Sequence, residues 1–163
     1  MNRLGPRNFS PGRIVPANEV SNSMTAQIAS IHTDQIKALL ADRGYDVTEP
    51  TSGVLRIQEV RSGVAVQAVL EGDILFLSLT CTTVPERAIT PDIMRTMLSA
   101  HNGISTSYFQ LYDSGDGQIA VTLSNFCKLE DLGHEDQDDI LACVHFLLVD
   151  VLAARQLLSD LLV

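Results

Sequence analysis

The sequence of 163 residues lacks tryptophan and is poor in aromatic side chains, cysteine and positive charge. Its three cysteines, an odd number spaced 46 and 16 residues apart, match neither a disulfide framework nor a zinc-binding spacing. Eleven basic side chains against 20 acidic ones give a net charge of −9. This charge argues against a nucleic-acid partner, because phosphate backbones require clustered Lys and Arg. A reduced, cytoplasmic compartment is the simplest expectation.

The chain does carry enough apolar side chains, 45% of the total, for one packed domain of ordinary size. Residues 1–23 differ, with three prolines, three arginines and one glutamate. Because proline fixes φ and lacks a main-chain donor, we expect a flexible N-terminal extension here and a single domain over 24–163. There are two alternatives for this segment. It is a basic arm that contacts an acidic surface, or the protein truly starts at Met24.

Hydrophobic spacing and turn residues predict three helices and five strands. The clearest helix start is Thr90-Pro91-Asp92, with a capping hydroxyl, proline at the first position and an early acid. The strand at 74–81 is apolar at nearly every position, which is typical of a strand covered on both faces. The predicted helices are 33–43, 91–101 and 136–162, and the predicted strands are 55–60, 64–70, 74–81, 107–112 and 119–124. Turns this short join antiparallel neighbours, so the order α-β-β-β-α-β-β-α predicts an α+β fold with a curved antiparallel sheet packed by helices.

The last predicted helix is long enough to raise the question of a membrane span. His145, Asp150 and Arg155 argue against one, since charge at the centre of a bilayer is costly. The helix is nonetheless apolar around most of its circumference, and leaving three leucine-sized side chains exposed would forfeit about 5–9 kcal/mol. The other two helices or a second subunit could cover them. We expect a homodimer and no membrane partner.

Motifs for catalysis and for metal or cofactor binding are not found. Asp113 and Asp116 fit a hairpin turn, because a calcium loop would need glutamate where Leu123 stands. The acidic residues after His134 are expected at the start of a helix, where the helix dipole is positive and stabilises negative charge. They are Glu135, Asp136, Asp138 and Asp139. A pairing of Cys127 with His134 is the remaining enzymatic alternative. We therefore predict no catalytic residue, no metal site and no cofactor.

Four residues are candidates for a partner-binding surface. Tyr108 and Tyr112 fall on the opposite strand face from Phe109, where a sheet can be open to a partner. Met94 and Met97 could line an adaptable peptide groove, because methionine packs against varied shapes. Core packing is the alternative for both methionines and for Phe109.

Three segments carry a resemblance to a known family: the strand at Asp73–Ser78, the end of the second helix at Ala100–Ile104, and the apolar last helix. Over about residues 30–160 the chain resembles the type III secretion chaperone-like fold. Within that fold it is similar to the YbjN-like family of bacterial sensory-transduction regulators. The resemblance implies a small, acidic, often dimeric binding module without enzymatic activity. Secretion chaperones of this fold bind an extended client segment, but no client-binding residue carries over to this chain.

The sequence therefore predicts a non-enzymatic protein-binding module, chaperone-like or regulatory, that binds a client protein segment. Its acidic body would suit a basic or amphipathic segment, with charge speeding the encounter. Two alternatives stay open: a small enzyme with a site assembled from Cys, His and Asp, and a purely structural dimerisation domain.

Overall fold

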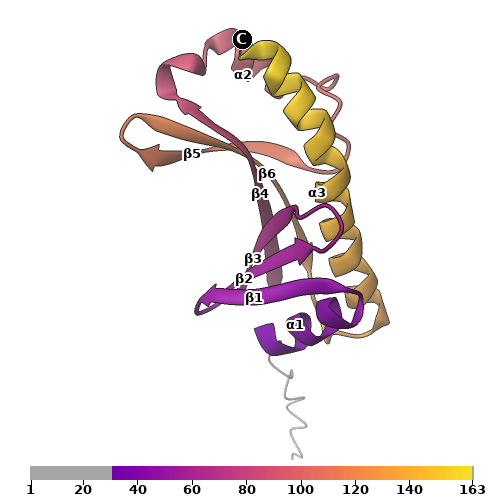
Figure 1. Ribbon diagram of the computed structural model, residues 1–163. Coiled ribbons are helices and arrows are strands. Elements are labelled where there is room, and N and C mark those ends of the chain that lie inside the picture. Colours follow the sequence, from indigo (N-terminus) through magenta and orange to yellow (C-terminus); the bar gives the residue numbers. More distant parts are fainter. Residues whose placement is uncertain (1–30, 163) are drawn as a thin grey trace, which may run out of the picture.

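The computed structural model describes residues 31–162, and the ribbon in Figure 1 follows them to the C-terminal helix. The expected extension at 1–23 and the expected domain start at 24 lie outside the described residues. In chain order the elements are α1 (Thr33–Asp42), β1 (Tyr45–Thr51), β2 (Val54–Glu59), β3 (Ala65–Glu71), β4 (Ile74–Pro85), the 3-10 helix η1 (Glu86–Ala88), α2 (Pro91–Met97), β5 (Tyr108–Gly115), β6 (Gln118–Lys128) and α3 (His134–Leu161).

The six strands form one sheet in the order β1-β2-β3-β4-β6-β5, and every neighbouring pair is antiparallel. β1 to β4 follow one another as a meander. η1 and α2 then carry the chain to the far edge, from which β5 turns back into β6 beside β4. The predicted α+β fold with a curved antiparallel sheet is confirmed, and the sheet has one strand more than predicted.

The additional strand is β1, which lies at one edge of the sheet and is mostly exposed. Only Tyr45 and Val47 are half-buried, so its hydrophobic alternation is too short to indicate a strand. Pro50 lies within it, and proline is tolerated on an edge strand because no neighbour needs its missing donor. Pairing with β2 and contact with α1 therefore form a strand that local sequence does not predict.

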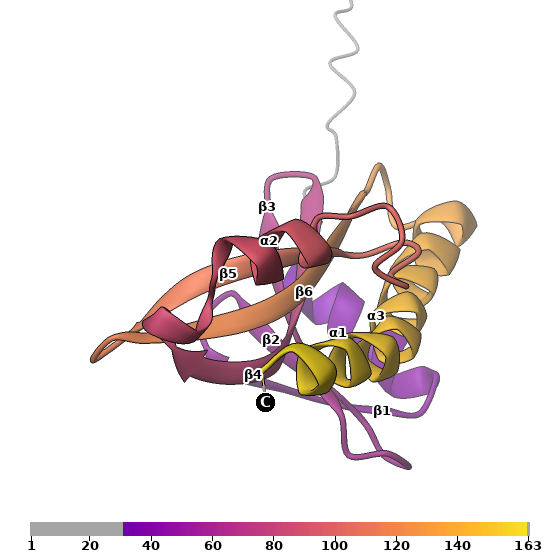
Figure 2. The same cartoon turned by 90° about the horizontal axis from the view of Figure 1, so that it is seen from above.

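The hydrophobic core lies on one face of the sheet. α3 packs across β4 and β6, while α1 packs against β1 and β2, as the two views in Figures 1 and 2 show. α3 is long and apolar enough to meet the simple criteria for a membrane span. Its buried face nevertheless forms part of this core, through Ile140, Val144, Leu147, Val151, Ala154 and Leu158. These six side chains share one side of the helix, as the 3.6-residue period requires.

A buried aspartate near the start of α3 holds the chain segment that leads into the helix. Oδ2 of Asp136 accepts hydrogen bonds from the main-chain N–H groups of Glu130, Asp131 and Leu132, at 2.7, 3.0 and 2.8 Å. Leu132 has a φ of 58°, in the left-handed region. The sequence predicts only a favourable interaction of this acidic run with the helix dipole. In the structure, Asp136 of this run fixes the connection between β6 and α3.

A second buried aspartate, four turns further along α3, holds the connection between α2 and β5. Asp150 is 3% exposed, and its carboxylate accepts hydrogen bonds from the main-chain N–H groups of Ser105, Thr106 and Ser107 at 3.4, 3.3 and 3.1 Å. The hydroxyls of Ser105 and Thr106 donate to it as well, at 3.2 and 3.3 Å. Because β5 begins at Tyr108, these contacts fix where that strand starts.

The expectation that the strand at 74–81 is covered on both faces is wrong. Leu75, Leu77 and Leu79 of β4 are buried in the core, but Phe76 between them points to the other face and is exposed. The helices that contact the sheet pack on the core face alone. The apolar residue on the second face of β4 is therefore not explained by packing within residues 31–162.

Candidate functional site

The sheet curves, so that its face opposite the core lies between two groups of strands. In Figure 1 this face is on the left, with β5 above and β1–β3 below. We call it the concave face and define it by the side chains Val69, Glu71, Phe76, Ser78, Tyr108, Gln110, Tyr112, Ser124 and Phe126. The strand register brings them together, since Phe76 pairs with Val69 and Phe126, and Ser124 pairs with Ser78 and Tyr108.

A cavity of about 350 Å³ lies at the centre of the concave face. Val69 and Phe76 line it from β3 and β4, and Tyr108, Gln110 and Tyr112 line it from β5. Side chains from separate strands thus converge on one hollow, because alternate residues of each strand point to this face. Its volume falls in the range of sites that hold a small ligand or a few side chains of a partner.

Two phenylalanines form the apolar part of the concave face. The rings of Phe76 and Phe126 are cross-strand neighbours with their centroids 6.2 Å apart and their planes tilted by 44°. This is a favourable arrangement for two aromatic rings. Phe126 nevertheless remains 57% exposed. Exposed aromatic pairs beside a cavity are typical of surfaces that bind a partner. A partner that covers them gains the free energy of burying apolar surface that is still exposed in the folded protein.

A hydrogen-bond network fixes the polar part of the same face. Oε1 of Gln110 accepts from the hydroxyls of Tyr112 and Ser124, at 2.6 and 2.7 Å. The Thr122 hydroxyl donates to the main-chain oxygen of Gln110 at 3.2 Å. Tyr112 is thereby held in place before any partner arrives. Such preorganisation lowers the entropic cost of binding.

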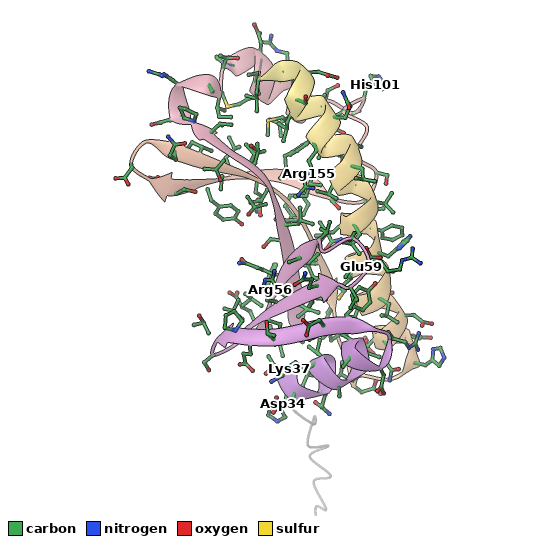
Figure 3. The ribbon with its side chains drawn as sticks, in the orientation of Figure 1. Asp34, Lys37, Arg56, Glu59, His101 and Arg155 are labelled. Carbon is green, nitrogen blue, oxygen red and sulfur yellow. The ribbon has the colours of Figure 1, made fainter. Side chains whose placement is uncertain are left out.

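Charges of both signs flank the aromatic part. On β2, the half-buried guanidinium of Arg56 donates to Oε1 of Gln58 at 2.7 Å, and Figure 3 places Arg56 on the side of β2 that faces the opening. Glu71 of β3 lines the cavity from the same sheet face. A bound segment could therefore meet an acid and a base as well as the two rings.

The structure brings together only part of the predicted partner surface. Tyr108 and Tyr112 are exposed and line the same cavity. Met97 is 3% exposed and packs in the core with Phe109, which was the alternative interpretation for these residues. Met94 is exposed on α2 but does not line the cavity.

Sequence reasoning missed the two phenylalanines at the centre of this face. Phe76 and Phe126 each stand between core-facing residues of a strand, so strict alternation already places them on the second face. The run of apolar residues in β4 suggested instead that both faces were covered. Comparing the number of apolar strand faces with the number of helices that can cover them would have identified both residues.

The alternative pairing of Cys127 with His134 is not present. Nδ1 of His134 lies 3.1 Å from Oδ2 of Asp138, one turn along α3. The neighbouring Cys143 thiol, together with burial, raises the pKa of the Cys127 thiol. Burial also raises the pKa of Cys81, to about 11, despite the favourable charge of Arg155. Both shifts favour the protonated thiol, which is a weak nucleophile.

The remaining polar clusters have structural explanations. The carboxylate of Asp113 accepts from the main-chain N–H of Gly115 at 2.8 Å, as a hairpin turn requires. Across residues 31–162, the His, Cys, Asp and Glu side chains form no group of three or more that could hold a metal ion.

Over the described residues 31–162, the geometry defines a fold class, an α+β domain in which helices pack on one face of an open antiparallel sheet and leave the other face free. The chain is similar to the crystal structure of YbjN from E. coli, a candidate transcription regulator, with a TM-score of 0.57 and 17% identity over 80% of this chain and 92% of that one. It is also similar to an uncharacterized protein from Methanothermobacter thermautotrophicus, with a TM-score of 0.51 and 11% identity over 79% and 98% of the two chains. No protein-family model and no curated protein matches the sequence. The chain has a YbjN-like fold.

Proposed function

We propose that this protein is a non-enzymatic binding module of the cytoplasm whose concave face holds a segment of a client or regulatory protein. The observation that carries the proposal is the exposed pair Phe76 and Phe126 beside a cavity whose polar side chains are already ordered. The description of YbjN as a candidate regulator supports a regulatory module rather than an enzyme.

The chemistry of the face indicates the kind of segment that fits. A large apolar side chain would cover the two rings and reach the cavity, while polar groups would meet Gln110 and Tyr112. The net charge of −9 favours a basic or amphipathic segment, because attraction at a distance speeds encounter. Once bound, the apolar contacts provide most of the affinity and make it less sensitive to salt.

The experiment is affinity capture with the full chain from cells that contain it, in about 50 mM and about 500 mM salt. A matched capture uses the Phe76→Ser, Phe126→Ser double variant. We expect one protein to be retained by the unmodified chain in both salts and to be lost from the variant. Identical captures by the two chains would contradict the proposal.

The outer side of α3 carries a second apolar surface, which we propose is covered by another copy of this chain. Phe146, Val149 and Leu152 are exposed at a spacing of three residues, and Leu152 is 69% exposed. Between Asp139 and Arg155 this helix exposes no Asp, Glu, Lys or Arg side chain. Two copies that each carry nine net negative charges repel except where both surfaces are uncharged, and a two-fold axis brings the same surface of each into contact.

Leu152→Glu is expected to convert the dimer to a monomer, since it places two buried carboxylates in the proposed contact. The measurement is the molar mass by light scattering at several protein concentrations. Leu98→Glu is the matched control, because Leu98 is also an exposed leucine but caps the end of α2 and is not part of α3. A monomeric unmodified chain, or a dimer that persists in the Leu152→Glu variant, would contradict this assignment.

A further inference from the structure

Two thiols meet where α3 crosses β6. Cys127 lies on the core face near the end of β6, and Cys143 lies in the third turn of α3. The two thiols are close enough for each to shift the pKa of the other. Cys143 Sγ also lies 3.7 Å from the main-chain oxygen of Phe126, the residue beside Cys127.

The main chain holds this pair in place. Nδ2 of Asn125 donates to the main-chain oxygen of Cys143 at 2.9 Å, and Asn125 is buried two residues before Cys127 on the same strand face. The helix turn that carries one thiol is thereby fixed to the strand that carries the other.

The two thiols differ in access and acidity. Cys127 is buried, whereas Cys143 is half-buried. The neighbouring Cys127 thiol lowers the pKa of Cys143, while burial and the negative charge of Asp139 oppose that effect. Cys143 is therefore the thiol that ionises first and that a small molecule can reach, and Cys127 is placed to react with it afterwards.

We propose that Cys127 and Cys143 form a peroxide-sensitive dithiol that closes to a reversible disulfide between β6 and α3. Sulfur of the Cys143 thiolate attacks one peroxide oxygen, the O–O bond breaks, and the departing hydroxide takes up a proton to become water. Cys143 is left as a sulfenic acid. The sulfur of Cys127 then attacks the sulfur of Cys143, the S–O bond breaks, and a second water leaves. One hydrogen peroxide is reduced to two waters as two thiols become one disulfide.

The surrounding charge selects the oxidant. Asp139 lies one turn before Cys143, and Asp136 lies one turn before that. A carboxylate near the thiolate repels anionic disulfides such as oxidised glutathione but does not repel neutral hydrogen peroxide. We therefore expect peroxide to oxidise the pair, and oxidised glutathione at the same concentration to react about tenfold more slowly or not at all.

The test uses the folded full chain carrying Cys81→Ser, so that the thiol pair is counted alone. After treatment with hydrogen peroxide, free thiols are labelled with N-ethylmaleimide and counted by intact mass. We expect both thiols to disappear together, a proteolytic peptide that links Cys127 to Cys143, and recovery of both thiols with dithiothreitol. The disulfide closes a loop of about 15 residues, so the thermal midpoint should rise by about 5–10 °C.

Two further variants assign the roles of the sulfurs. With Cys127→Ser, Cys143 should accumulate as a sulfenic acid, because the resolving thiol is gone. With Cys143→Ser, Cys127 should react at least about tenfold more slowly. The inference is overturned if the Cys81→Ser chain keeps both thiols in peroxide that oxidises the same chain unfolded in urea. It is overturned equally if the linked peptide is absent. The linked-peptide result decides the question even if a single-cysteine variant fails to fold.

Discussion

Replacing Asp150 with alanine is expected to lower the free energy of unfolding by about 3–5 kcal/mol. The carboxylate is buried and accepts from three main-chain N–H groups and two hydroxyls of residues 105–107. Alanine would leave these donors without their acceptor and would release the start of β5. The effect combines unsatisfied buried donors with the loss of contact between α3 and the segment ahead of β5.

Urea unfolding followed by circular dichroism measures this effect. Asp150→Asn keeps one acceptor oxygen and should show an intermediate loss. Asp160→Ala is the matched control, since Asp160 is exposed on the same helix and should change stability by less than about 0.5 kcal/mol. A loss of less than about 1 kcal/mol for Asp150→Ala would show that the carboxylate does not hold the segment.

The same carboxylate makes stability depend on pH in a defined direction. Burial alone would raise the pKa of Asp150, but the donors of residues 105–107 outweigh burial and hold its pKa below the usual range. Because the folded pKa lies below the unfolded value of about 3.9, this contribution is complete above that value. It is lost as pH falls through the folded pKa. The stability difference between the unmodified chain and Asp150→Asn should therefore shrink below about pH 4.

The second large effect concerns binding rather than folding. Phe76→Ser with Phe126→Ser is expected to weaken the captured partner's affinity by at least about 30-fold, because a single aromatic residue at the centre of an interface contributes about 2 kcal/mol or more. Both side chains are exposed, so the fold should lose little stability. Titration calorimetry with the captured partner measures the affinity, and thermal unfolding measures the fold.

The control for this prediction is Val60→Ser. Val60 is also an exposed apolar residue, but it does not line the cavity. The Val60→Ser variant should bind the partner with the same affinity as the unmodified chain. If Val60→Ser and the double variant weaken binding equally, the loss reflects general surface chemistry and the concave face is not the contact.

The fold could be predicted because its signals are local. Thr90 accepts from the main-chain N–H of Ile93 at 3.3 Å, as its place before Pro91 indicates. The hairpin of β5 and β6 follows from alternating side chains and a Gly/Asp turn, and α3 follows from its long apolar period. These patterns are set by residues a few positions apart, so sequence alone contains them.

The site could be predicted only in part because it depends on contacts distant in sequence. Tyr108 and Tyr112 were placed correctly on the free face by alternation within one strand. Recognising Phe76 required knowledge that no helix within residues 31–162 covers its side of β4. Asp150 contacts residues 43–45 positions earlier, and nothing in its own helix indicates that partner. Cys127 and Cys143 likewise meet only through the packing of α3 on β6.

A photoreactive amino acid, p-benzoylphenylalanine, placed at position 126 of the full chain in cells tests whether the concave face holds a partner segment. Irradiation should join position 126 to a different protein, and the linked peptide of that protein should be amphipathic or basic with a large apolar residue at the crosslink. The same amino acid at position 60 serves as the control. If position 126 links only to a second copy of this chain, or to nothing beyond what position 60 gives, the concave face does not hold a partner segment.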